Sequence, residues 1–447
     1  MAVGAVMGAM IAFAQVAHAQ LPRVQLPNLP RVDLPNTVTD TVNGTVNGVA
    51  NDADVRRLAD LRRLRIGELL RTQRASVERD PNGAPILRAE IVAFSPSDAA
   101  LDGARSAGFT VARERVLDGL DARVVVLRAP DGMSTRRALD RLRALDPGGS
   151  YDFNHIYLES GDVDSGYVGS GASKPQPPAS TGEPAGGVKL GLVDGGIDLA
   201  HPVFRDAAIH QHGCNDKPVP SAHGTAVASL MIGKSEMFHG AAPGAELFAA
   251  DVYCGLGAGG AVDAVVEGIA WIARQRVPVI NVSLVGPRNL TLENVVKVVL
   301  ARGFIIVAAV GNDGPAAPPL YPASYPGVVG VTAVDAHERV LLEACRGPQV
   351  AFAAPGADMA AAVLSPSFAA VRGTSFAAPI VAGLLAEQLR EPDPAAAQSA
   401  VASLAQQALD LGSRGFDKVY GNGLVGNSVR TPPVVALIGS SSRLVGK

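Results

Sequence analysis

Cysteine, aromatic residues and net charge are all scarce in this sequence. Its 447 residues include three cysteines and one tryptophan, and the formal net charge is −3. Three cysteines allow one disulfide and leave one thiol over. The small net charge gives no indication of nucleic acid or an anionic membrane as a partner. Charged residues make up 18% and hydrophobic residues 47%, which excludes a disordered chain and leaves room for two domains, one with a full α/β core.

Long apolar runs are absent after the N-terminus, so the sequence predicts no membrane-spanning helix. Residues 2–16 form one apolar run, and Ala17-His18-Ala19 follows it. The run is shorter than the roughly 20 residues that a spanning helix needs, and small residues flanking His18 fit a signal-peptidase site. We therefore expect a signal peptide over residues 1–19 and export to the periplasm or the exterior, although no Lys or Arg precedes the run.

The next two segments differ in composition. Residues 20–54 are rich in Pro, Asn, Val and Thr without helical periodicity, which predicts a disordered tether. Residues 55–84 contain an Arg-rich amphipathic helix that we expect to reach Arg79. Its apolar side is predicted to carry Leu58, Leu61, Leu64 and Leu69.

Residues 85–158 show strand and helix patterns in the order β-α-β-β-α-β. The strand-like stretches are 86–94, 111–116, 122–127 and 152–157, and the helical ones are 97–107 and 134–145. This order predicts a split ferredoxin-like α+β domain. A stretch rich in Gly, Ser and Pro follows at 159–187 and predicts a flexible linker.

Residues 188–430 alternate apolar strands with helices, and 431–447 form a C-terminal tail. Such alternation predicts an α/β domain with a mostly parallel sheet covered by helices on both faces. Sites in these sheets lie at the carboxyl ends of strands, which is where Asp194, Ser283 and Asn312 are expected.

Three side chains in this region have complementary chemistry. Asp194 ends an apolar strand, His223 begins a helix of small residues, and Ser375 opens an Ala-rich helix that we expect to extend to about Arg390. Each alone has a structural explanation, such as an N-cap for the serine. Together they provide a carboxylate to orient an imidazole, an imidazole to accept a proton and a hydroxyl to attack a carbonyl group.

The motifs around these residues resemble those of the subtilisin-like serine proteases, over about residues 187–426. The order Asp, His, Ser is that of subtilisin. The matching motifs are Val193-Asp194-Gly195-Gly196-Ile197-Asp198, His223-Gly224-Thr225, Ala308-Ala309-Val310-Gly311-Asn312-Asp313-Gly314 and Gly373-Thr374-Ser375-Phe376-Ala377-Ala378-Pro379. The resemblance implies an exported serine endopeptidase that acts on polypeptides through an acyl-enzyme, with Asn312 as the side-chain donor of the oxyanion hole.

The resemblance also implies where a substrate lies, as an extended strand between two segments. The implied substrate-binding residues are Gly257, Gly259, Ser283, Leu284, Val285, Gly286 and Tyr321. Because no charged residue is evident near residues 321–326, we expect an apolar or aromatic side chain before the scissile bond. Three residues depart from the family pattern: Gly195 lacks a supporting hydroxyl, and Phe376 and Val285 are larger or differently shaped than usual.

Further expectations come from the same resemblance. The domain at 85–158 is similar to the family's propeptides, which assist folding and occupy the cleft, so we expect a zymogen whose self-cleavage falls in or just before the 159–187 linker. The alternative is a permanent accessory domain. Because the resemblance places Cys214 and Cys254 near the cleft, we expect them to form the disulfide and Cys345 to remain free. Family members often bind Ca²⁺, but no calcium site can be assigned from the sequence. We expect a monomer.

Four alternative interpretations have some support in the sequence. An esterase of the α/β-hydrolase type needs its His after the Ser, and the last His here is His337. The Gly-rich stretch 255–260 lacks the spacing of a dinucleotide-binding motif. A metal site could be built from His210, His212, Cys214 and Asp216. A pseudoprotease that binds peptides without cutting them would retain the same motifs.

Overall fold

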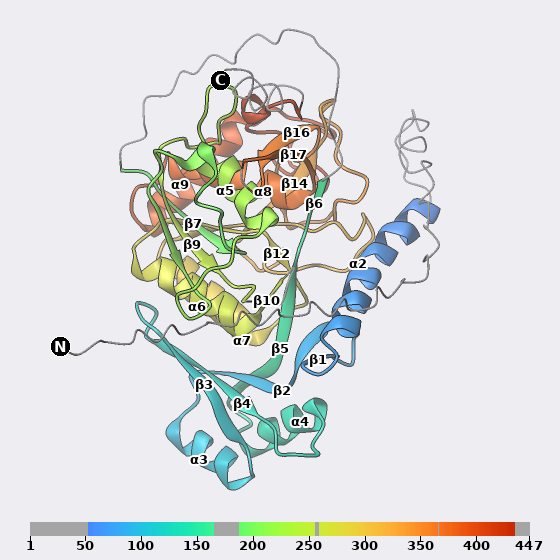
Figure 1. Ribbon diagram of the computed structural model, residues 1–447, viewed down its shortest axis with the longest axis vertical. Helices are drawn as coiled ribbons and strands as arrows, with labels where there is room; N and C mark the ends of the chain where they lie inside the picture. Colours follow the sequence, from blue (N-terminus) through green and yellow to red (C-terminus); the bar gives the residue numbers. More distant parts are fainter. Residues whose placement is uncertain (1–51, 165–186, 255–258, 365, 434–447) are drawn as a thin grey trace, which may run out of the picture. The chain divides into compact units, whose positions relative to one another are not determined.

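The computed structural model describes residues 52–164, 187–254, 259–364 and 366–433, with the backbone alone at 52–61 and 164 (Figure 1). The predicted signal peptide, nearly all of the tether, most of the linker and most of the C-terminal tail lie outside these residues. Within the described part, no helix is both long and apolar enough to cross a membrane.

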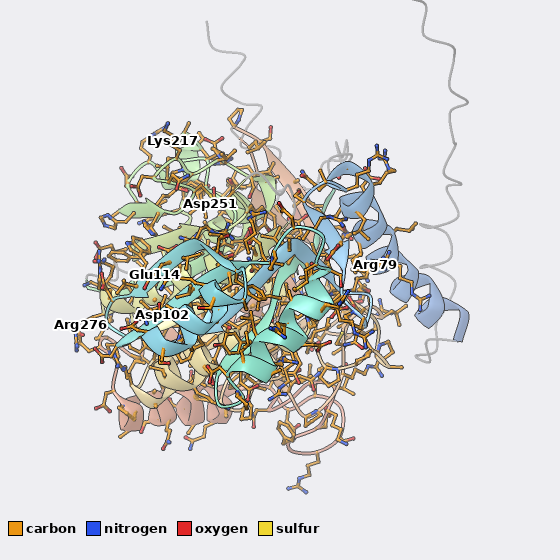
Figure 2. All side chains as sticks on the ribbon, turned by 90° about the horizontal axis from the view of Figure 1, so that it is seen from below. Arg79, Asp102, Glu114, Lys217, Asp251 and Arg276 are labelled. Carbon is orange, nitrogen blue, oxygen red and sulfur yellow. A yellow bond between two sulfur atoms is a disulfide. The ribbon has the colours of Figure 1, made fainter. Side chains whose placement is uncertain are left out.

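The N-terminal domain is an antiparallel sheet with two helices in the predicted β-α-β-β-α-β order, preceded by a third helix and a short strand. Its elements are α2 (Asp52–Thr72), β1 (Val77–Arg79), β2 (Pro85–Phe94), α3 (Asp98–Ser106), β3 (Thr110–Leu117), β4 (Ala122–Arg128), α4 (Thr135–Leu145) and β5 (Ser150–Glu159). The central strands lie in the order β5-β2-β4-β3. Ser97 and Ser134 cap the helices by accepting hydrogen bonds from backbone N–H groups of the first turn. Figure 2, seen from below, shows Asp102 of α3 and Glu114 of β3 on this domain.

The helix expected to reach Arg79 ends earlier, at Thr72. Residues 77–79 instead form β1, which pairs with β2. The predicted apolar side was also partly wrong, because Leu64 is 67% exposed whereas Ile66 is only 6% exposed. Ile66 packs with Ile156 and Leu158 of β5, so the contact with that strand, rather than leucine spacing, sets which side of the helix is buried. The side chains of residues 58 and 61 lie outside the described part.

The larger domain contains a sheet in the order β15-β14-β13-β11-β7-β9-β8, in which every pair of neighbours is parallel. Its strands are β7 (Lys189–Asp194), β8 (Ile209–His212), β9 (Glu246–Asp251), β11 (Val279–Val282), β13 (Ile305–Ala309), β14 (Val329–Val334) and β15 (Val350–Pro355). Its helices are η1 (Pro202–Phe204), α5 (Ala222–Ile232), α6 (Val262–Arg274), α7 (Leu290–Ala301), α8 (Thr374–Ala386), α9 (Pro394–Gln407) and η2 (Asn427–Val429). Helices α5 and α8 pack against each other, as do α6 and α7, which confirms the predicted α/β class.

Sequence patterns missed β8, β15, α9 and the short hairpin of β16 (Met359–Ala362) and β17 (Phe368–Arg372). The hairpin is rich in alanine, a residue that is depleted in strands. Its strands are held by pairing with each other, and β17 also pairs with β6 (Asp162–Asp164). The helix predicted to reach Arg390 ends at Ala386.

The last strand of the N-terminal domain is longer than the predicted 152–157 and continues into the larger domain. Figure 1 shows β5 leaving the small sheet and running to the larger domain, with β6 beyond it. There β5 pairs antiparallel with β10 (Gly259–Ala261) and β12 (Leu284–Val285). Within the predicted linker, Glu159 is thus the last residue of β5 and residues 162–164 form β6, because the larger domain supplies pairing partners for their backbone.

Candidate active site

Asp194 and His223 form a buried pair at the carboxyl end of the parallel sheet. Asp194 is the last residue of β7, and His223 lies in the first turn of α5, whose N-cap is Ser221. The Nδ1 of His223 is 2.9 Å from Oδ1 of Asp194, which also accepts a 2.7 Å hydrogen bond from the Gly195 N–H. The carboxylate is therefore placed to fix the orientation and tautomer of the imidazole.

Ser375 lies beside this pair, in the first turn of α8. Its Oγ donates to the carbonyl of Ser283 at 3.0 Å and accepts from the N–H of Ser160 at 3.1 Å. The His223 ring is 5.4 Å, centre to centre, from the ring of Phe376, the next residue along. Among the hydrogen bonds of the described residues, none joins Ser375 to His223. The structure thus brings Asp194 and His223 into direct contact and places Ser375 next to them.

Asn312 and Ser375 together hold one backbone carbonyl group. The oxygen of Ser160 accepts from Asn312 Nδ2 at 3.0 Å and from the Ser375 N–H at 3.0 Å. The Asn312 amide is oriented by a 3.2 Å bond that its Oδ1 accepts from the Thr374 N–H. Two donors aimed at a single carbonyl oxygen are the arrangement that stabilises an oxyanion.

Gly373 allows this close approach. Its φ is +141°, and a Cβ at this position would lie 2.6 Å from both Asn312 Nδ2 and the Cα of Gly161. Any other residue at 373 would therefore push the donor and the held peptide apart. On the far side of the held carbonyl, a Cβ at Gly161 would lie 2.5 Å from the Phe376 ring, so the backbone passes close to that ring too.

The implied substrate-binding residues contact the chain's own strand β5. Leu158 is paired with both Gly259 and Val285, and Glu159 is paired with Leu284. Ser283 accepts the Ser375 hydroxyl bond described above.

Gly286 faces an aromatic side chain of the same strand. A Cβ there would come within 2.8 Å of the Tyr157 ring, whose hydroxyl donates to the Pro287 carbonyl at 2.6 Å. Tyr321 forms a backbone bridge with Gly286. Gly257 lies outside the described residues. Ser160, which carries the carbonyl held by Asn312 and Ser375, is a small polar residue, and the expected apolar preference before the scissile bond stays a prediction.

Electrostatics at the site couples His223 to two carboxylates. Burial alone would lower the pKa of His223, but the charges of Asp194 and Glu159 and the hydrogen bond to Asp194 outweigh it and raise the pKa to about 9. Burial raises the pKa of Glu159, although the positive charge of His223 opposes that shift. Since each carboxylate favours the imidazolium, the imidazole is more basic here than in water.

Cys214 and Cys254 form a disulfide, as expected, and Cys345 is a buried free thiol. Burial raises the pKa of Cys345 to about 12, which makes it a poor nucleophile. The proposed metal set does not assemble: His210 pairs with Glu246 at 2.8 Å, and His212 with Glu267 at 2.5 Å. Across the described ranges, no group of three or more His, Cys, Asp or Glu residues is arranged to hold a metal ion.

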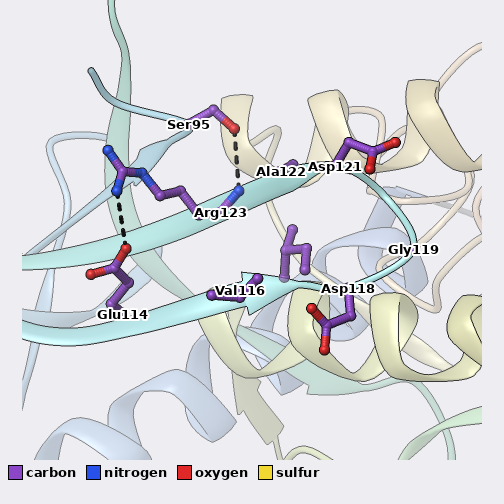
Figure 3. A pocket seen from close by; sticks show the side chains of 9 residues that line it. Ser95, Glu114, Val116, Asp118, Gly119, Asp121, Ala122 and Arg123 are labelled. Carbon is purple, nitrogen blue, oxygen red and sulfur yellow. Dashed lines mark hydrogen bonds and ion pairs between the residues drawn. The ribbon is translucent and has the colours of Figure 1, made fainter. Parts of the chain in front are cut away.

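A hollow on the N-terminal domain lies beside the β3–β4 hairpin (Figure 3). Arg123 forms an ion pair of 3.2 Å with Glu114, and its backbone N–H donates to Ser95 Oγ at 3.3 Å. The residues that line the hollow include no histidine that could activate a nucleophile. The carboxylate, imidazole, amide and hydroxyl groups described above lie instead around residues 160 and 375.

Sequence reasoning did not identify Glu159, Ser160, Gly161 or Tyr253 as site residues. The Tyr253 hydroxyl lies 3.2 Å from Asp194 Oδ1 and 3.1 Å from Glu159 Oε2. The only sequence signal for the first three was the expectation that self-cleavage falls in or just before residues 159–187. Tyr253 gave no sequence signal. Its contact forms only because its ring, which follows the end of β9, reaches Asp194 at the end of the neighbouring strand β7.

Comparison with known proteins shows the family and the fold. The model of the subtilase family (Peptidase_S8) matches residues 185–423, more than half of the chain. Subtilisin E of Bacillus subtilis (strain 168) is 32% identical over 244 residues, which are 52% of this chain and 64% of that protein. Subtilisin of Bacillus pumilus is 32% identical over 266 residues, 57% of this chain and 95% of that protein.

Among solved structures, fervidolysin from Fervidobacterium pennivorans, a keratinolytic enzyme related to subtilisin, shares the fold with a TM-score of 0.63. It is 21% identical and is matched over 79% of this chain and 61% of its own. The parallel sheet and the residues at its carboxyl edge define a subtilisin-like α/β protein. The chain belongs to the subtilase family. It spans less than two-thirds of the length of subtilisin E.

Proposed function

We propose that the protein is a serine endopeptidase with Asp194, His223 and Ser375 as its catalytic triad. The observation that carries this proposal is the Ser160 carbonyl, which is held by Asn312 Nδ2 and the Ser375 N–H while Ser375 Oγ lies against the same residue. A peptide carbonyl in this position is ready for nucleophilic attack. Family membership supports the same reaction.

In this mechanism Ser375 Oγ attacks the carbonyl carbon and its proton passes to His223 Nε2. The resulting oxyanion receives hydrogen bonds from Asn312 and the Ser375 N–H, and Asp194 stabilises the imidazolium. Collapse breaks the C–N bond, and the leaving amine takes the proton from His223. Water then attacks the acyl ester with His223 as the base, which releases the acid and restores the serine.

We further infer that the chain is a zymogen whose N-terminal domain is its own first substrate and inhibitor. Strand β5 occupies the place of a substrate between β10 and β12, and β6 continues on the far side along β17. The bond at the centre of this path is Ser160–Gly161, which we assign as the self-cleavage site. The 1–19 segment supports export of the zymogen, polypeptides are the substrates, and a monomer is the state we infer.

A fluorophosphonate probe tests the proposed function. We expect the wild-type chain to be labelled and to yield a fragment whose N-terminus is Gly161, and the Ser375→Ala chain to show neither. Ser403→Ala, which changes a serine on α9, is the matched control and should behave as wild type. A folded wild-type chain that binds peptides but takes up no probe would support the pseudoprotease instead.

A further inference from the structure

Tyr253 places one hydroxyl group between the catalytic carboxylate and the substrate-like strand. Its side chain is 5% exposed and follows β9 by two residues. The hydroxyl lies 3.2 Å from Asp194 Oδ1, 3.1 Å from Glu159 Oε2 and 3.5 Å from His223 Nδ1. Glu159 is the residue immediately before Ser160, so one phenol contacts both the triad and the side chain of the second residue on the acyl side of the scissile bond.

The backbone beside Asp194 is shaped to admit this ring. A Cβ at Gly195 would lie 2.9 Å from Tyr253 Cδ2 and 2.4 Å from Ser221 Oγ. The distance to the ring is shorter than real Cβ contacts allow, so a side chain at 195 and the tyrosine in this position exclude each other. The absence of a side chain at 195 and the presence of Tyr253 therefore form one local arrangement.

We propose that Tyr253 is a positioning residue for Asp194 and the residue that determines specificity for the side chain second before the scissile bond. It favours Glu or Gln there over an apolar side chain of similar length. This proposal rests on the proposed endopeptidase function, and it defines the substrate class as polypeptides with such a residue at the position of Glu159.

The chemistry of a phenol accounts for this selection. The hydroxyl has one proton to donate and lone pairs to accept with. When it donates to Asp194, its oxygen can accept from the amide of a Gln or from a protonated Glu; when Glu is ionised, the hydroxyl can donate to it instead. A methionine or leucine at the same position offers neither interaction and leaves a buried polar atom without its partner.

Peptides based on residues 156–161 test the proposal. The second residue before the scissile bond would be Gln, Glu, Met or Leu, and kcat and KM would be measured with the self-processed full chain after titration of its active serine. With wild type we expect kcat/KM to be about three- to tenfold higher for Gln than for Met. In Tyr253→Phe this ratio should fall to about one. Loss of the contact with Asp194 should also lower kcat by the same factor for all four peptides.

The matched control is Tyr420→Phe, which removes a hydroxyl at a distance from the site and should keep the wild-type ratio. A Tyr253→Phe enzyme that retains the Gln preference, or that loses activity on all peptides equally with the ratio unchanged, overturns the role in specificity. If neither the peptides nor the chain itself is ever cleaved, the proposed function falls instead.

A stability measurement, which needs no hydrolysis, tests the contact between Tyr253 and residue 159 if nothing is cleaved or if the Tyr253→Phe variant is poorly active. In the Ser375→Ala chain, E159M should lower the melting temperature relative to E159Q by roughly 1–2 °C. The difference should disappear when Y253F is added. Equal melting temperatures of E159M and E159Q with Tyr253 present would contradict the proposed contact.

Discussion

At the scale of single residues, the raised pKa of His223 opposes the role of general base that we propose for it at neutral pH. In the proposed mechanism, His223 can accept a proton from Ser375 only when its Nε2 is unprotonated. Its pKa is raised to about 9 because Asp194 and Glu159 outweigh the effect of burial. Below that pH the imidazolium predominates, so self-cleavage should accelerate as the pH rises toward 9. Under the proposed function, Glu159 of the inhibiting segment would therefore also lower the fraction of His223 that can act as a base.

Glu159→Gln should shift this pH profile. The substitution removes one of the two charges that raise the pKa of His223, while Asp194, Tyr253 and Arg65 remain nearby. The midpoint of the self-cleavage rate should move to lower pH, and the rate at pH 7 should rise about three- to tenfold. The rate would be followed on gels after dilution of the unfolded chain into buffers of increasing pH.

Asp162→Asn provides the matched control for this experiment. Asp162 lies on the other side of the scissile bond, and its side chain is 67% exposed, so water screens its charge. We expect its self-cleavage rate at each pH to stay within about twofold of wild type. A Glu159→Gln profile that coincides with wild type would show that the Glu159 charge does not act on His223.

The sequence predicted the site residues that lie within a recognisable sequence motif. It missed the residues whose role depends on contacts with distant parts of the chain. Asp194, His223, Asn312 and Ser375 each lie in a motif of glycines and small residues that the local backbone requires. Tyr253 has no such motif, because its role comes from a ring that crosses to the Asp194 carboxylate. The roles of Asp194, His223 and Ser375 stay predictions until the labelling experiment is done.

At the scale of elements, α2 is an addition to the ferredoxin-like unit that covers the substrate-like strand. Ile66 packs against Ile156 and Leu158 of β5. Arg62 forms a 3.2 Å ion pair with Asp313, which follows Asn312 in the chain. Arg65 pairs with Asp162. Arg62 and Arg65 thereby join α2 to residues beyond Gly161, so α2 should strengthen binding of the N-terminal domain to the larger domain after cleavage at the proposed site.

Ile66→Ala should therefore weaken inhibition by the cleaved N-terminal domain. Removing this buried isoleucine side chain destabilises the packing of α2 on β5 within the fragment by about 2 kcal/mol or more, so the fragment should hold β5 less firmly in its binding conformation and its inhibition constant should rise, by no more than about 30-fold. Leu64→Ala is the matched control on the same helix, because Leu64 is 67% exposed and should contribute little. Titration of the mature enzyme with each purified fragment measures both values, and equal constants for the two variants would show that α2 does not hold the strand.

Prediction of elements succeeded where periodicity or glycine boundaries were strong, as in β7, β13 and α4. It failed where pairing partners decide the structure. Strand β5 appeared too short because its last residues pair with β10 and β12, which lie more than 90 residues later in the chain. The Ala-rich strands β16 and β17 were missed for the same reason, since their own sequences do not favour a strand.

At the scale of the whole molecule, the two domains share one hydrophobic core before cleavage. Val92, Val124 and Tyr157 of the N-terminal domain belong to the same buried cluster as the strands of the parallel sheet. A polar network reinforces this junction: Asn154 Nδ2 lies 2.9 Å from Glu90 Oε2 and 2.9 Å from Asp263 Oδ1. The uncleaved chain should therefore unfold as a unit rather than domain by domain.

The Ser375→Ala chain allows this to be measured without self-cleavage. We expect the fluorescence of Trp271, the single tryptophan, and the far-ultraviolet circular dichroism to follow one coincident denaturation curve. Adding Asn154→Ala should lower the free energy of unfolding by about 1–3 kcal/mol, because Asn154 is fully buried and its loss removes one hydrogen bond from each of Glu90 and Asp263, which keep Arg113 as a shared donor.

Arg274→Ala is the control at the same junction, where Arg274 pairs with Asp118 at 2.9 Å but both side chains are more than half exposed. Such a pair contributes about 0.5 kcal/mol or less. If the two probes instead gave separate transitions, the N-terminal domain would be an independent unit that merely rests on the catalytic domain. Cleavage at residue 160 would then release it without loss of a shared core, and the inhibition we infer would depend on β5 and α2 alone.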